Sequence, residues 1–137
     1  MNEIAQKTVL ISGGAGSMGQ LVSDYISSRN DFIMTAIHDP NYDGQEYKIY
    51  KDLTNIEEDI VVEFSPASVI NKNIEKLLDS NADLIIGSSG VSAEMLSKLK
   101  KTTDRKIIVI PNFSIGAAYQ KLFSASLSKN FEDRKST

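Results

Sequence analysis

The stretch Val9-Leu10-Ile11-Ser12-Gly13-Gly14-Ala15-Gly16-Ser17-Met18-Gly19 decides how the rest of the chain is arranged. An apolar run ends in a cluster of glycines, and an amphipathic pattern begins directly after it, which is typical of a strand, a tight turn and a helix N-terminus. The glycines fit two spacings, G-x-G-x-x-G from Gly14 and G-x-x-G-x-M-G from Gly13. Such a turn lets a phosphate approach the backbone amides at the start of a helix, where an anion is favoured. The stretch therefore predicts a nucleotide-binding loop, although a glycine turn that binds nothing would show the same spacing.

The composition is that of an ordinary globular domain. Of 137 residues, 41% are hydrophobic and 24% charged, which suits one domain with one core. The formal net charge of −3 argues against a nucleic-acid or anionic-membrane partner, and no apolar run is long enough to span a membrane. The absence of cysteine removes disulfides, thiolate catalysis and zinc–thiolate sites, so we expect no metal site. The first residues lack the regions of a signal peptide, and we expect a cytoplasmic protein.

Strand and helix patterns alternate along the chain. We predict strands over residues 7–12, 32–37, 47–50, 60–65, 83–86 and 107–110, and a helical turn over 53–58. Helices are expected after the glycine loop, from Pro66 with Ser65 as N-cap, after Ser92 as N-cap, and finally up to about Phe131. This alternation predicts a doubly wound, parallel, Rossmann-like α/β sheet in three layers over residues 1–131, with a frayed tail over 132–137.

Asp39 lies twenty residues after Gly19, where dinucleotide-binding folds place an acid on the adenosine ribose. An aspartate before Pro40 is also a common turn residue, so both roles stay open. His38 is the only histidine, and a lone histidine at a strand end is more often structural than catalytic.

Three loops follow predicted strands and carry glycine or asparagine: residues 13–19, 87–90 and 111–116. Each alone is explained as a turn. In a parallel sheet they would share the carboxyl edge, where a long dinucleotide would lie.

These loops, in this order, resemble those of the 4-hydroxy-tetrahydrodipicolinate reductase family, also called dihydrodipicolinate reductase. The matching segments are Gly13-Gly14-Ala15-Gly16-Ser17-Met18-Gly19, Val61-Val62-Glu63-Phe64-Ser65-Pro66, Gly87-Ser88-Ser89-Gly90 and Pro111-Asn112-Phe113-Ser114-Ile115-Gly116. The glycine loop is generic, whereas the Asn-Phe-Ser-Ile-Gly segment is more specific. The family reduces a cyclic intermediate of diaminopimelate and lysine biosynthesis with NADH or NADPH.

The resemblance implies a cofactor site and no catalytic residue in this stretch. By that likeness the pyrophosphate would be held by Gly13, Gly14, Ala15, Gly16, Ser17 and Met18. The adenosine ribose would meet His38 and Asp39. The nicotinamide side would be held by Gly87, Ser88, Ser89, Ile110, Pro111, Asn112 and Phe113.

The family's substrate-binding domain, with its histidine- and lysine-bearing catalytic motif, would follow the last helix and is not matched here. We therefore expect an NAD(P)H-binding domain that does not catalyse the reduction by itself: part of a longer enzyme, with the substrate domain in cis, or a naturally short relative. The alternatives are a stand-alone NAD(P)-binding module, a degenerate relative that binds the cofactor without catalytic activity, and a Rossmann-like scaffold that binds another nucleotide or nothing. The family's architecture also allows a homo-oligomer.

The residues favour NADH over NADPH. Ser17 stands where the family often has an arginine, and the Asp39 carboxylate would repel a 2′-phosphate. Arg29 is at the far end of the first helix and is not placed to offset that repulsion, whereas Lys48 could swing in across an irregular segment, so its role stays open.

Overall fold

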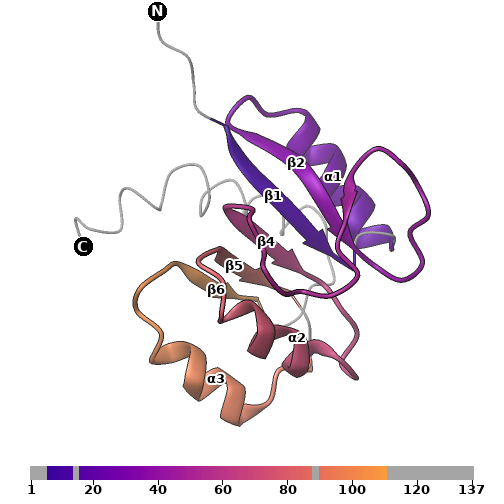
Figure 1. The fold of residues 1–137 in the computed structure, drawn as a ribbon. Coiled ribbons are helices and arrows are strands. Elements are labelled where there is room, and N and C mark those ends of the chain that lie inside the picture. The colour runs from indigo at the N-terminus through magenta and orange to yellow at the C-terminus, as the bar shows by residue number, and fades with distance from the viewer. Residues whose placement is uncertain (1–5, 14–15, 88–89, 111–137) are drawn as a thin grey trace, which may run out of the picture.

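The chain forms one parallel sheet with helices on both faces (Figure 1). The computed structural model describes residues 6–13, 16–87 and 90–110. In chain order the elements are β1 (Lys7–Ser12), α1 (Ser17–Ser27), β2 (Phe32–His38), β3 (Lys48–Ile49), β4 (Ile60–Glu63), α2 (Ile70–Leu77), β5 (Asp83–Ile86), α3 (Ala93–Lys100) and β6 (Ile107–Val109). The strand order is β3-β2-β1-β4-β5-β6, and every described pair is parallel. The predicted doubly wound, Rossmann-like sheet is confirmed.

Two separate apolar clusters lie on the two faces of the sheet, because successive residues of a strand point to opposite sides. On one face α1 packs over the sheet, with a buried set of Val9, Ile11, Val22, Ile26, Ile60, Val62 and Ile85. On the other face α2 and α3 pack over Leu10, Val61, Leu84 and Ile86 through Ile70, Ile74, Leu77, Met95 and Leu99. The fold therefore has the three layers that the sequence predicts.

Most predicted elements are present, with shifted ends. Residues 7–12 match β1, β2 is one residue longer than predicted, and the third strand has two residues instead of four. Ser92 caps α3 as predicted, since its hydroxyl accepts the Met95 N–H at 3.0 Å. The predicted last helix, up to residue 131, lies outside the described residues.

Two local predictions are wrong. Residues 53–55 form bends, 56–58 have no regular structure, and the segment is not a helical turn, because Asn55 has a positive φ of 56°, which a right-handed helix does not accept. β4 ends at Glu63, and α2 begins at Ile70 and not at Pro66. Ser65 does not cap the helix because it is buried and its hydroxyl contacts other side chains, as described below.

Candidate functional site

A cleft of about 910 Å³ opens at the carboxyl edge of the sheet, beside the ends of β1, β2 and β4. In this strand order the chain winds away from β1 in opposite directions, through β2 on one side and β4 on the other. That reversal is where doubly wound sheets bind their ligands, and the volume is within the usual range for a small-molecule site.

The glycine turn forms one wall of the cleft. Gly13 has a φ of +84°, and its N–H donates to the His38 carbonyl at 2.7 Å. A Cβ on Gly13 would lie 3.2 Å from the backbone carbon of Phe64, so only glycine fits there without strain. The first turn of the chain after β1 is therefore pressed against the segment that leaves β4.

Gly16 precedes α1 and leaves the helix start open. As a glycine it has no side chain to cap α1, and the first turn of α1 holds no acidic residue. A Cβ on Gly16 would have the Gly13 oxygen at 3.8 Å as its nearest described neighbour, so it would occupy open space in the cleft. An uncapped helix start with room in front of it suits an anionic group such as a pyrophosphate.

His38 and Asp39 lie together in the cleft, at the end of β2. One oxygen of Asp39 accepts the Asn41 N–H at 2.9 Å, which is the turn role that the sequence left open. The same carboxylate lines the cleft, so the turn role does not remove it from the site.

The His38 ring contacts a buried side chain of β1. Its Nδ1 lies 3.0 Å from the Ser12 hydroxyl, and burial lowers the pKa of His38, with Asp39 and Asp52 acting in the opposite direction. The imidazole is therefore neutral at pH 7.

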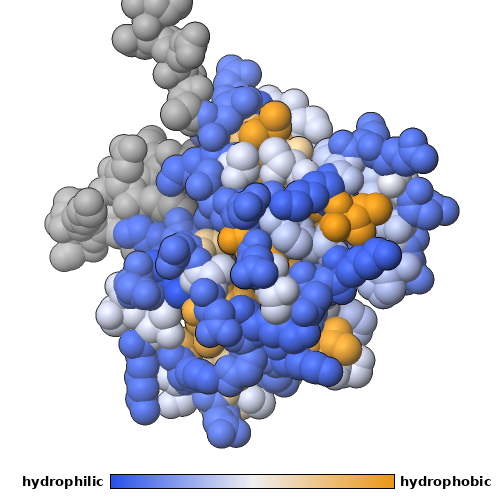
Figure 2. Space-filling view, viewed as in Figure 1, coloured by the Kyte–Doolittle hydropathy of each residue, from blue (hydrophilic) through white to orange (hydrophobic). Residues whose placement is uncertain are grey.

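The segment after β4 forms an apolar wall with Phe64, Pro66 and Val69, and Ile49 of β3 also lines the cleft. Among the described residues, Val69 and Ile49 are two of the most exposed large apolar residues, at 39% and 41%. Elsewhere the surface seen in Figure 2 is mostly hydrophilic, with apolar residues in small separate patches. The sequence analysis did not assign a binding role to this wall. The exposed Val69, beside a buried Ile70, is a signal that could have found it, because only one of the two can face the core.

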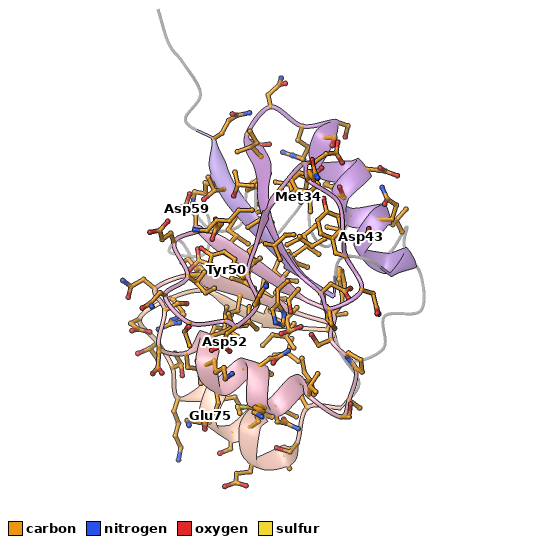
Figure 3. All side chains as sticks on the ribbon, turned by 45° about the vertical axis from the view of Figure 1, so that its right-hand side comes forward. Met34, Asp43, Tyr50, Asp52, Asp59 and Glu75 are labelled. Atoms are coloured by element: carbon orange, nitrogen blue, oxygen red, sulfur yellow. The ribbon has the colours of Figure 1, made fainter. Side chains whose placement is uncertain are left out.

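Three lysines that the sequence analysis did not consider also line the cleft: Lys51, Lys72 and Lys76. Lys76, on α2, forms an ion pair with Asp52, which Figure 3 shows beside that helix. The two cations that it did consider are engaged elsewhere. Arg29 pairs with Asp31 at 2.7 Å beyond the end of α1, and the Lys48 ammonium contacts Tyr50 and Glu57.

The remaining predicted residues are partly described. The Gly87 N–H donates to the Glu63 carbonyl at 2.9 Å and the Ile110 N–H to the Ile86 carbonyl at 2.8 Å, which puts both at the carboxyl edge, Gly87 next to the end of β4 and Ile110 next to the end of β5. Ser17 and Met18 are the first residues of α1. The other predicted site residues lie outside the described residues: Gly14, Ala15, Ser88, Ser89, Pro111, Asn112 and Phe113.

A chain of buried polar side chains lies under the cleft. The Ser12 and Ser65 hydroxyls are 3.1 Å apart, and the Asn73 amide donates to the Ser65 hydroxyl at 3.0 Å. The Glu63 carboxyl accepts the Ser65 N–H at 2.8 Å and is fully buried. Burial raises the pKa of Glu63, while the polar groups of Ser65, Ser12 and Asn73 act in the opposite direction.

The described residues contain neither a cluster of metal-binding side chains nor a membrane-spanning helix. No group of three or more histidine, aspartate or glutamate side chains among them could hold a metal ion. None of the helices in the described ranges is both long and apolar enough to cross a membrane.

Comparisons with known proteins place the chain among its relatives. The 4-hydroxy-tetrahydrodipicolinate reductase of Dictyoglomus turgidum is 24% identical over 93% of this chain and 53% of its own length. That of Coxiella burnetii is 27% identical over 91% of this chain and 52% of its own. The chain thus spans about half the length of the curated relatives it matches.

Two solved structures share the fold. Dipicolinate-bound dihydrodipicolinate reductase from Paenisporosarcina sp. TG-14 has a TM-score of 0.67, at 23% identity over 88% of this chain and 54% of that one. A Rex-family repressor has a TM-score of 0.57, at 19% identity over 96% of this chain and 63% of that one. The family model described as "Dihydrodipicolinate reductase, N-terminus" matches residues 7–113. The chain therefore belongs to the family of dihydrodipicolinate reductase N-terminal domains.

Proposed function

We propose that this chain is the part of a 4-hydroxy-tetrahydrodipicolinate reductase that binds and orients NAD(P)H. The observation that carries the proposal is the uncapped start of α1, which opens into the cleft at the switch point of the sheet. The family match over residues 7–113 and the relatives named above support the reductase assignment.

Each part of a bound dinucleotide would meet a different part of the cleft. The backbone around Gly16 would hold the pyrophosphate. The Asp39 carboxylate would accept hydrogen bonds from the adenosine ribose, and the wall of Phe64 and Val69 would cover the base. Gly87 and Ile110, at the ends of the next strands, would lie toward the nicotinamide.

When bound, the reduced cofactor supplies the hydride, and this chain supplies binding and orientation. The neutral imidazole of His38 is at the end of the cleft assigned to the adenosine, so it is not placed to act on a substrate at the nicotinamide. The acid that completes the reduction, and the groups that bind the substrate carboxylates, would come from the domain that the longer relatives add.

We also propose that NADH binds more tightly than NADPH, by several-fold. Asp39 would oppose a 2′-phosphate, since two unit charges about 4 Å apart interact by about 4 kcal/mol at an effective dielectric of about 20, before screening. The lysines on the rim lessen this repulsion, but Lys76 is already paired with Asp52. The preference for NADH over NADPH is therefore modest, and the carboxylates of Asp39 and Asp52 maintain it.

Calorimetric titration of the 137-residue chain with NADH and NADPH at matched ionic strength tests the proposal. We expect both to bind, with NADH tighter. Adenosine monophosphate should bind weakly on its own, and nicotinamide mononucleotide more weakly still, because the described cleft is the adenosine part of the site. Failure of both dinucleotides to bind would refute the proposed function, and equal or tighter binding of NADPH would refute the preference.

A further inference from the structure

Glu63 is an acid in a place where strands normally carry apolar residues. It ends β4 in the middle of the sheet, paired in register with Ser12 of β1 and Ile86 of β5, and its side chain is 0% exposed. Burying a carboxyl is costly unless it makes hydrogen bonds that the fold needs. The position therefore calls for a role that an apolar residue could not fill.

The carboxyl holds the segment that leaves β4. One oxygen accepts the Ser65 N–H at 2.8 Å, which closes a tight turn directly after the strand. Its other oxygen, Oε2, is buried with no hydrogen-bond partner among the residues that the structure describes. Because burial raises the pKa of Glu63, the neutral acid is favoured there, and no cation is needed to balance it.

From Ser65 the contacts lead to the floor of the cleft. Its hydroxyl is 3.1 Å from the Ser12 hydroxyl, which in turn is 3.0 Å from Nδ1 of His38. The same Ser65 hydroxyl accepts the Asn73 amide from α2. Ser65, Asn73 and His38 line the cleft, whereas Glu63 and Ser12 lie behind them.

The contacts thus join four segments: the ends of β1 and β2, which are far away in the sequence, and the end of β4 with helix α2, which follow each other. Each hydroxyl in the chain has a neighbour on both sides, so its orientation is determined by the neighbours. Removing the acceptor at Glu63 would release the Ser65 N–H and the turn that carries the hydroxyl.

We propose that Glu63 is a positioning residue of the dinucleotide site: by accepting the Ser65 N–H it fixes Ser65 and, through Ser12, the imidazole of His38 where the adenosine part of the cofactor binds. This inference rests on the proposed function. It adds a residue that does not touch the cofactor and that acts through Ser65, Ser12 and His38.

Two substitutions at Glu63 distinguish the effect of its hydrogen-bond acceptor from the effect of its charge. Glu63→Gln keeps an oxygen for the Ser65 N–H and resembles the neutral acid, so its NADH affinity should stay within about threefold of the unmodified chain. Glu63→Leu keeps the approximate size but has no acceptor, and it should weaken NADH binding by about 10-fold or more. The control is Ile60→Val at the other end of β4, which lowers stability through packing and should leave the affinity unchanged.

His38 provides a second readout, since the chain has one histidine and therefore one set of imidazole NMR signals. Without ligand, Glu63→Leu should shift the ring nitrogen signals of His38, while Glu63→Gln and Ile60→Val should leave them in place. If the signals shifted only because packing was lost, Glu63→Gln would not return them to their positions in the unmodified chain. If Glu63→Leu does not fold, Ser65→Ala replaces it, because it removes the hydroxyl that joins Ser12 to Asn73 and should weaken NADH binding as well.

Several results would overturn the proposal. These are unchanged NADH affinity in folded Glu63→Leu, or in Ser65→Ala where that variant replaces it; an unmoved His38 signal in Glu63→Leu; and equal losses in the glutamine and leucine variants. If the unmodified chain does not bind NADH, it is the proposed function that fails, and the His38 signals still show whether Glu63 positions that ring.

Discussion

Two connections from strand to helix form the walls of the cleft, and they differ in what they do with their polar groups. Between β1 and α1, the Gly16 N–H donates to the Gly13 carbonyl at a long 3.4 Å, and the helix starts without a side-chain cap. Between β4 and α2, the Glu63 carboxyl and the Ser65 hydroxyl use the local donors internally. In the proposed site, the first connection would offer amides to the ligand, and the second would support the segment against which that ligand lies.

The largest effect should come from adding a side chain to the connection between β1 and α1, which we call the open connection. Gly16→Val would put a branched side chain where the pyrophosphate is expected, and should weaken NADH binding by about 100-fold or more, since two charge-assisted hydrogen bonds of about 1.5 kcal/mol each would be lost. The backbone of Gly16 is extended, so the variant should fold. Calorimetric titration measures the loss, and circular dichroism checks the fold.

The matched control is at the capped helix. Ser92→Ala removes the hydroxyl that accepts the Met95 N–H, and should cost about 1 kcal/mol of stability while leaving NADH affinity unchanged. Full NADH affinity in folded Gly16→Val would contradict the placement of the pyrophosphate.

A smaller effect, on stability, separates the two glycines of the open connection. Gly13→Ala forces a side chain into a positive φ and against Phe64, and should lower the free energy of unfolding by about 1–2 kcal/mol or more. Gly16→Ala meets neither problem and should change stability much less. Urea denaturation of the two variants side by side checks this, and equal losses would mean that the tight approach to Phe64 costs nothing.

Glu63, in the connection between β4 and α2, should make the free energy of unfolding depend on pH. Because burial raises the pKa of Glu63 above its ordinary 4.5, the folded chain binds a proton more tightly than the unfolded chain. Stability from this group is complete below pH 4.5 and is lost as pH rises through the raised pKa, with a slope of at most about 1.4 kcal/mol per pH unit.

Glu63→Gln should remove that decline, and urea denaturation over a pH series measures it. His38, whose pKa is lowered, contributes the opposite trend near its ordinary 6.5, and it is present in both proteins. A decline that persists in the glutamine variant would assign the proton to another group.

Cofactor choice should respond to Asp39 by several-fold. Asp39→Asn removes the charge that opposes a 2′-phosphate but keeps an oxygen to accept the Asn41 N–H, so the turn should survive. We expect the gap between NADH and NADPH to narrow, in titrations at matched ionic strength. A gap that does not change would mean that the carboxylate does not face the ribose.

The smallest effect should come from the rim of the cleft. Asp52→Asn releases Lys76 from its ion pair and removes one negative charge, so NADPH should gain slightly relative to NADH, because exposed ion pairs contribute little. Lys98 and Glu75, which join α2 to α3 away from the cleft, provide a control pair: Glu75→Gln should leave the ratio unchanged. An equal response to both variants would show a general charge effect.

The sequence alone determined the order of strands and helices, the doubly wound sheet and the glycine turn. These features depend on residues close together in the chain: apolar runs that end at glycine, helical spacing, and the Ser92 cap. Asp39 could be found in the same way, because its distance from the glycine loop follows from the length of one β-α-β unit.

Only the tertiary structure decided which polar side chains line the cleft and which lie buried behind it. The Ser65 hydroxyl has the local features of a helix cap, but contacts with Ser12, 53 positions away, and with Asn73 determine its role. Lys76 reaches the cleft because α2 packs beside the segment that holds Asp52, 24 positions earlier. A local pattern records the preferences of neighbouring residues, whereas the position of a buried acid or a rim lysine depends on contacts between segments that only the packed sheet brings together.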